Sequence, residues 1–66
     1  MGKSKAEMLL KECSSRNILL AIEYQKTNGF SVEILNRSHE IMFYTDGHTK
    51  LKTAVKEAAK FVNSLH

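Results

Sequence analysis

The spacing of apolar residues changes twice along this chain, and this change limits the folds that it can adopt. Near both ends, apolar residues recur every three or four positions, as they do on one face of a helix. Between these stretches apolar and polar residues alternate, which is typical of strands with one buried face. The 66 residues allow one domain, and a domain of this size buries only about 60% of the surface that its unfolded chain exposes. We therefore expect a single α+β domain over residues 1–66, with a thin core.

Residues 4–15 are expected to form the first helix, because their apolar residues fall on one stripe. The stripe consists of Ala6, Leu9, Leu10 and Cys13. Ser4 and Glu7 have the spacing of a capping box, in which the serine side chain bonds the glutamate backbone and the glutamate side chain reaches back. Asn17 is predicted to end the helix in a left-handed conformation.

Residues 18–26 and 30–35 are expected to form a hairpin around Asn28 and Gly29. A two-residue turn would split the apolar residues between the two sheet faces, whereas a three-residue loop over 27–29 keeps them on one face. In the register of the longer loop the pairs are Tyr24 with Val32, Ile22 with Ile34 and Glu23 with Glu33. The sequence therefore predicts the longer loop, with a left-handed Gly29 in a β-bulge.

Residues 40–45 are expected to form a third strand after a turn over residues 36–39. The expected register pairs Ile34 with Ile41 and Val32 with Phe43, which puts all three strands on one apolar face. Residues 46–48 are expected to form a loop before Thr49, the predicted N-cap of a second helix over residues 49–65. The inward stripe of that helix consists of Leu51, Ala54, Val55, Ala58, Phe61, Val62 and Leu65.

Both predicted helices have to cover the same face of the three-stranded antiparallel sheet, since their apolar stripes have no other surface to bury. The opposite face is too apolar for a surface that contacts only water. Its candidate partner-binding residues are Leu19, Ala21, Leu35, Met42 and Tyr44. These residues favour a protein–protein interaction module, with a homodimer as one form of it. The small size of the chain suits an accessory or inhibitory protein of the kind that mobile elements encode.

The charge and cysteine content favour a small basic protein of the cytoplasm. Ten lysines and arginines against seven acidic residues give a net charge of +3, which permits a polyanionic partner. Cys13 is the only cysteine, so no internal disulfide forms, and a reducing compartment is expected. No apolar run reaches the roughly 18 residues of a membrane span, and the first residues lack the apolar stretch of a signal peptide.

Two stretches of sequence carry a resemblance to a known family. Leu9-Leu10-Lys11-Glu12-Cys13 looks like the first helix of the double-stranded-RNA-binding domain, and the stretch from Gly47 to Ala54, followed by Ala58-Ala59, looks like the start of its second helix. The expected order of a helix, three strands and a helix also resembles that domain. The resemblance implies an α-β-β-β-α fold and recognition of duplex RNA by shape, 2′-hydroxyls and phosphates.

Basic residues near the starts of the two helices are the candidate contacts to nucleic acid, because free N–H groups and the positive end of the helix dipole favour phosphates there. The candidates are Lys3, Lys5, His48, Lys50, Lys52 and Lys56. Asp46 and His48 are close in sequence, but no nucleophile or metal-ligand spacing accompanies them. We therefore expect a non-catalytic binding module without a cofactor or metal.

Overall fold

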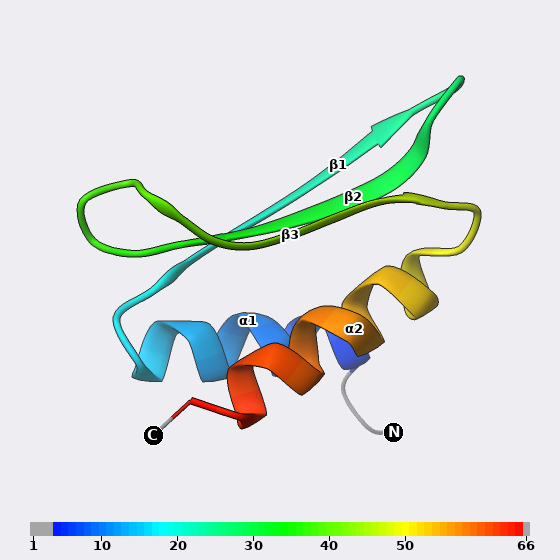
Figure 1. The fold of residues 1–66 in the computed structure, drawn as a ribbon. Helices are drawn as coiled ribbons and strands as arrows, with labels where there is room; N and C mark the ends of the chain where they lie inside the picture. The colour runs from blue at the N-terminus through cyan, green and yellow to red at the C-terminus, as the bar shows by residue number, and fades with distance from the viewer. Residues whose placement is uncertain (1–3, 66) are drawn as a thin grey trace.

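The computed structural model describes residues 4–65, which form a helix, three strands and a second helix. Helix α1 spans Lys5–Ser15, strand β1 Leu19–Gln25, strand β2 Gly29–Leu35, strand β3 Ile41–His48 and helix α2 Leu51–Asn63. The strands form one antiparallel sheet in the order β1-β2-β3, and both helices lie beneath the same face of it (Figure 1). The predicted α-β-β-β-α fold, with an open three-stranded sheet, is confirmed.

Local signals set the two ends of α1 as predicted. The Ser4 side chain accepts a hydrogen bond of 3.2 Å from the backbone N–H of Glu7 and thereby satisfies one of the free donors of the first turn. Beyond the C-cap residue Arg16, Asn17 is left-handed with a φ of 59°. Helix α2 differs from its prediction, because β3 continues to His48 and the N-cap is Lys50, not Thr49.

The register predicted for β1 and β2 is wrong by two residues. Ile22 lies opposite Val32 and Tyr24 opposite Phe30, so residues 26–28 form the turn and Gly29 lies opposite Gln25 in a continuous ladder. Gly29 is left-handed as predicted, with a φ of 80°. A shift of two residues leaves every side chain on its expected face, and contact between the Tyr24 and Phe30 rings, with centroids 4.8 Å apart, supports the observed pairing.

The register predicted for β2 and β3 is also wrong, because the turn between them is longer than expected. The backbone N–H of Asn36 donates to the carbonyl of Glu40, and the Asn36 side-chain oxygen accepts from the backbone N–H groups of Ser38 and Glu40, each at 2.9 Å. The longer turn and a bulge next to it together place Ile34 opposite Phe43, not Ile41, and Val32 opposite Thr45.

A register shift between Ile34 and Leu35 changes which side chains of β3 face the helices. Ile41 lies opposite Leu35 and is 60% exposed, although it was predicted on the apolar face. Met42 was predicted on the opposite face, but it is half-buried and packs against the core. Both errors have one cause: a bulge adds a residue to one strand and reverses the alternation beyond it.

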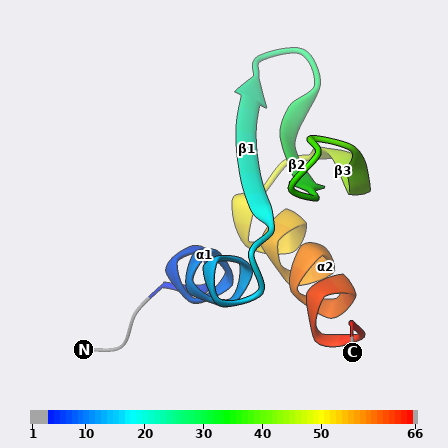
Figure 2. The same cartoon turned by 90° about the vertical axis from the view of Figure 1, so that its left-hand side faces the viewer.

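The core lies between the central strand β2 and the two helices. Its fully buried residues are Leu9, Cys13, Val32, Ile34, Ala54, Val55, Ala58 and Val62. At its margin the rings of Phe43 and Phe61 stack with centroids 5.2 Å apart, which joins β3 to α2. Figure 2 shows the two helices side by side beneath the twisted sheet, with α1 below β1.

Candidate functional site

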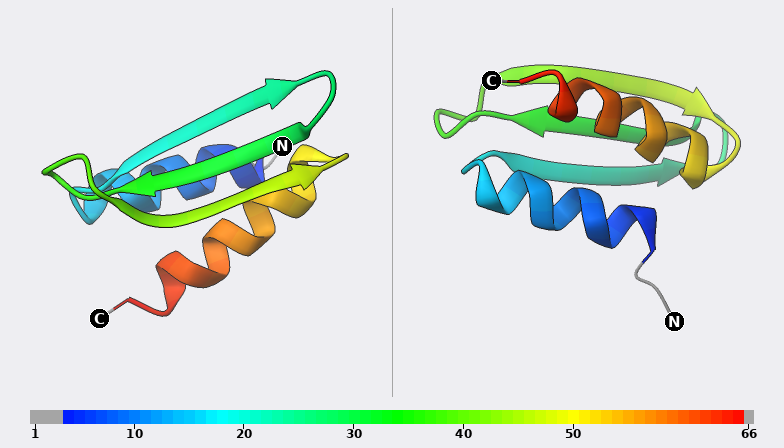
Figure 3. Two further views of the ribbon diagram at one scale, coloured as in Figure 1. Left: turned by 45° about the horizontal axis from the view of Figure 1, so that its top comes forward. Right: turned by 90° about the horizontal axis from the view of Figure 1, so that it is seen from below.

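The N-terminal ends of the two helices lie at the same end of the molecule, because α1 and α2 run in the same direction beneath the sheet (Figure 3). This arrangement brings Lys5 of α1 close to Lys52 and Lys56 of α2, although these residues are far apart in the sequence. A hollow between the helix starts is lined by Ser4, Lys5, Ala6, Leu51, Lys52 and Val55. We call the exposed residues Lys5, Lys50, Lys52 and Lys56 the basic end.

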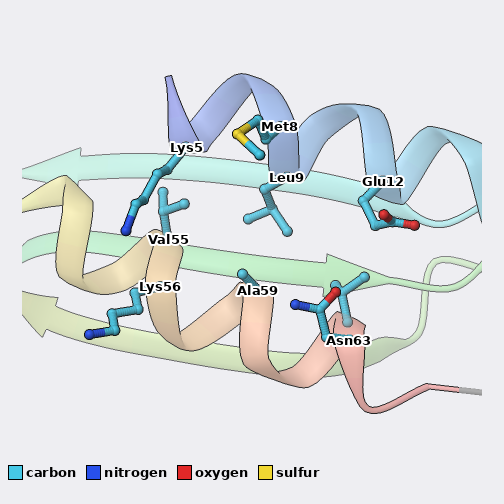
Figure 4. A pocket seen from close by; sticks show the side chains of 9 residues that line it. Lys5, Met8, Leu9, Glu12, Val55, Lys56, Ala59 and Asn63 are labelled. Carbon is cyan, nitrogen blue, oxygen red and sulfur yellow. The ribbon is translucent and has the colours of Figure 1, made fainter. Parts of the chain in front are cut away.

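A second hollow continues from the basic end along the seam between the helices and has a volume of about 290 Å³. Figure 4 shows that the Lys5 side chain extends from α1 toward α2 and that Lys56 lies at the same end. The middle is apolar, with Leu9 and Ala59 facing each other, and Glu12 and Asn63 lie at the far end. The groove is therefore positive at one end, apolar in the middle and polar at the far end, where Glu12 places a carboxylate.

The lysines of the basic end have no carboxylate partners among the described residues. In residues 4–65 the ion pairs join Arg16 with Glu12 at 3.3 Å and His48 with Glu57 at 2.8 Å, and neither uses a lysine. Two helix N-termini add their positive dipole ends to the lysine charges. The arrangement can hold an anion that extends over both helices, such as a row of phosphates.

His48, which was predicted to act with the lysines, makes side-chain contacts with Thr45 and Glu57. Its ring is half-buried, and Nε2 lies 2.7 Å from the Thr45 hydroxyl and 2.8 Å from the Glu57 carboxylate. These contacts join the end of β3 to α2. The predicted contact Lys3 lies outside the described residues, so four of the six predicted contacts form the basic end.

The sheet face away from the helices, which we call the outer face, carries a row of apolar residues across all three strands. Leu19, Leu35 and Ile41 lie directly opposite one another, and Leu19 and Ile41 are exposed. Ile41 was not predicted among the outer-face residues, because the face on which it lies depends on the bulge. The Asn36 turn was the available signal, since an asparagine that bonds the backbone two residues ahead favours a longer loop.

The next part of the outer face is acidic. Ala21, Glu33 and Tyr44 form the second cross-strand row, and the Tyr44 hydroxyl donates a 3.2 Å hydrogen bond to Asp46. The pKa of Tyr44 is raised above its ordinary value, first by desolvation, then by this hydrogen bond and by the charges of Asp46, Glu33 and Glu23. The outer face therefore carries a cluster of acidic residues, while Glu7, Glu12 and Glu57 lie on the two helices.

The thiol of Cys13 lies within the core. Cys13 is fully buried, and burial, followed by the nearby Glu12 charge, raises the pKa of its thiol, with Arg16 opposing. Residues 4–65 contain no cluster of three or more histidine, cysteine or acidic side chains that could hold a metal ion. Within the same residues, neither helix has the length and apolar character needed to cross a bilayer.

The basic end and the outer face are the two surfaces from which a function can be inferred. Comparisons with protein-family models, with curated proteins and with solved structures gave no match to this chain. A function therefore has to be inferred from the residues that the fold brings together.

Proposed function

We propose that the protein is a non-catalytic binding module that takes duplex RNA at its basic end. The observation that carries this proposal is the convergence of Lys5 from α1 with Lys52 and Lys56 from α2 around two adjoining hollows. Two helices that run side by side present hydrogen-bond donors to phosphate groups, spaced over a surface, as binding to a duplex requires. The acidic residues near Tyr44 lie on the outer face, away from this surface.

The lysine positions differ from those of the double-stranded-RNA-binding domain that the sequence resembles. With Ala54 aligned to the alanine of that family, its three basic positions fall on Leu51, Lys52 and Val55. Here Val55 is buried and Leu51 is half-buried, so both serve the core. In the proposed binding mode Lys5 and Lys56 supply the charge that these two positions lack.

A salt titration tests the proposal most directly. If about three phosphates are neutralised, the affinity for a duplex falls about 40-fold between 50 and 200 mM salt, at a slope near −0.9 per contact. We expect duplex RNA to bind more tightly than duplex DNA of the same sequence, because shape and 2′-hydroxyls distinguish the two. A gel-shift titration with both duplexes at both salt concentrations measures these differences.

A matched pair of double variants locates the contacts. Lys52→Ala with Lys56→Ala removes two charges from the basic end and should flatten the salt slope by about one to two units. Lys11→Ala with Lys60→Ala removes the same charge from the same two helices at exposed positions nearer their C-terminal ends, and should leave the slope nearly unchanged. An equal decrease of the salt slope in both double variants would mean that the net charge of the protein alone attracts RNA. Absence of binding at 50 mM salt would remove the proposal.

A second candidate function is docking of a protein partner on the outer face, favoured by the apolar row of Leu19, Leu35 and Ile41. A pulldown from cell extract with and without nuclease separates the two functions. A partner that survives nuclease treatment and is lost on Ile41→Lys binds this face, whereas a partner lost on nuclease treatment reaches the protein through nucleic acid.

A further inference from the structure

The hollow along the seam between the helices, which we call the seam groove, changes its chemistry from one end to the other. Lys5 and Lys56 lie at one end, and Glu12 and Asn63 lie at the other (Figure 4). The positions of Lys5 and Glu12 in α1 put the two ends about 10 Å apart along the helix axis. A ligand that fills the groove therefore meets cations first, then an apolar surface and then polar groups.

The polar groups at the far end have hydrogen-bonding capacity to spare. Glu12 contacts Arg16 Nε at 3.3 Å and Ser15 Oγ at 3.5 Å, both through Oε2. Among residues 4–65, Oε1 of Glu12 and the side-chain amide of Asn63 have no hydrogen-bond partner. A carboxylate only accepts hydrogen bonds, whereas an amide both donates and accepts them. An acyl chain would remove water from these groups without pairing them, which is unfavourable.

The apolar middle of the groove suits a flat ring. Met8 lines it and is 58% exposed, although the neighbouring Leu9 is buried in the core. The Met8 side chain lies over the α1 side of the seam, and Ala59 faces it from α2 (Figure 4). Methionine is flexible and polarisable, and its sulfur packs well against aromatic rings. A ring placed between Met8 and Ala59 would cover this exposed apolar surface.

We infer that the seam groove binds one unpaired nucleotide at the end of an RNA duplex, an inference that rests on the proposed function because the duplex lies at the adjoining basic end. The phosphate lies between Lys5 and Lys56, and the edge of the base faces Glu12 and Asn63. Phosphate, base and hydrogen-bonding edge thus follow one another in the order in which the groove offers their complements.

Adenine fits the far end of the groove better than a base with a carbonyl group at the same position. Its edge presents a ring-nitrogen acceptor beside an amino donor, a pattern that an asparagine side chain can pair in full. The second hydrogen of the amino group is then available to the Glu12 carboxylate. Hypoxanthine has a carbonyl oxygen in place of the amino group, and that oxygen would face the carboxylate without a hydrogen between them.

Gel-shift titrations with three versions of one RNA duplex test the inference. The duplex is blunt, or carries a single unpaired adenosine at each end, or carries inosine there, whose base is hypoxanthine. We expect the adenosine overhang to raise the affinity at least about fivefold over the blunt duplex, because it adds a charge-assisted hydrogen bond. The inosine overhang should lose most of this gain. Duplexes with the overhang on the 3′ or on the 5′ strand are both measured, and a gain from either one supports the inference.

Two variants with matched controls locate the nucleotide. Met8→Ala should reduce the gain from the adenosine overhang, whereas Leu10→Ala, at another exposed apolar residue of α1 outside the seam groove, should leave it unchanged. Glu12→Gln should reduce the preference for adenosine over inosine, because a glutamine amide can donate to the carbonyl oxygen. Glu33→Gln removes the same charge from the outer face and should leave the preference as it is. Circular dichroism of each variant verifies that the fold is intact.

The blunt duplex separates failure of this inference from failure of the proposed function. If the blunt duplex binds and neither overhang adds affinity, the inference is overturned while RNA binding at the basic end stands. If adenosine and inosine overhangs add equally, the assignment of the base edge to Glu12 is wrong. If none of the duplexes binds at 50 mM salt, the proposed function and the inference fail together.

Discussion

Replacing Gly29 by alanine should destabilise the protein by two separable effects. Gly29 has a φ of 80°, and an L-residue in the left-handed region costs about 1–2 kcal/mol. A Cβ at this position would also overlap the carbonyl oxygen of His48 in β3 and lie 3.0 Å from its carbonyl carbon. Both neighbouring atoms belong to backbone, so the strands have to move apart, and such overpacking typically costs a further 1–3 kcal/mol.

Gly47 supplies the control that separates the two effects. Its φ is 75°, nearly the same as at Gly29, but a Cβ there meets nothing within 4 Å. Gly47→Ala should therefore cost only the conformational part, about 1–2 kcal/mol, whereas Gly29→Ala should cost about 2–5 kcal/mol. For a chain of this size the total free energy of unfolding is about 3–10 kcal/mol, so the second variant is close to unfolding.

Urea unfolding followed by circular dichroism measures both free energies under one set of conditions. Thermal unfolding gives a second measure, since each kcal/mol lowers the Tm by about 4–8 °C in a domain of this size. The expected overlap with His48 requires Gly29→Ala to be less stable than Gly47→Ala by at least about 1 kcal/mol. Equal losses in the two variants would show that β3 yields to the added methyl group without cost, and would refute it.

Three further predictions concern the core, the start of α2 and Tyr44. Ile34 is fully buried, so Ile34→Ala should cost about 2–5 kcal/mol and Ile34→Val about 0.5–1.5 kcal/mol in urea unfolding, while Ile41→Ala at an exposed site should stay within about 0.5 kcal/mol. Lys50 has extended backbone angles suited to an N-cap but makes no side-chain cap bond. Lys50→Asn should therefore raise the free energy of unfolding by about 1 kcal/mol and reduce the salt slope of RNA binding by about one unit. The control Thr49→Asn changes a residue just outside the cap and should have neither effect. The raised pKa of Tyr44 means that the folded state favours the neutral phenol. The contribution of this group to stability is therefore complete below pH 10.0, its ordinary pKa, and is lost as the pH rises through the raised pKa of the folded state. In a Tyr24→Phe background, phenolate absorbance should show that Asp46→Asn moves the pKa of Tyr44 toward 10.0, and an unchanged titration would contradict the assigned hydrogen bond.

The parts of the fold that local chemistry determines could be predicted from the sequence. Ser4 and Glu7 set the start of α1, Asn17 its end, and the left-handed Gly29 the first hairpin. The register of β1 and β2 could not be predicted, because a shift of two residues leaves the same side chains on each face. The register of β2 and β3 could not be predicted because it depends on the length of the Asn36 turn and on a bulge. Only the tertiary contact between Tyr24 and Phe30 and the Asn36 turn distinguish the observed pairings from the expected ones.

The candidate site was predictable in its residues but not in its geometry. The sequence shows lysines near the starts of two helices, yet their convergence depends on α1 and α2 running in the same direction, which the connecting sheet decides. The face of Ile41 and the burial of Met42 depend on a bulge that leaves no trace in the alternation of residues. The strand order β1-β2-β3 was predictable, because two successive hairpins place the second strand at the centre of the sheet.

The buried thiol of Cys13 is a natural probe of local opening in the folded protein. The thiol has no exposed surface and lies on α1, in contact with the core. A labelling reagent can reach it only when α1 separates from the sheet, so the rate of labelling in the folded state measures the population of that opened form. Because Cys13 is the only cysteine, the measurement needs no engineered probe. Comparison of that opening free energy with the global free energy of unfolding would show whether α1 leaves the sheet as a separate unit or only when the whole domain unfolds.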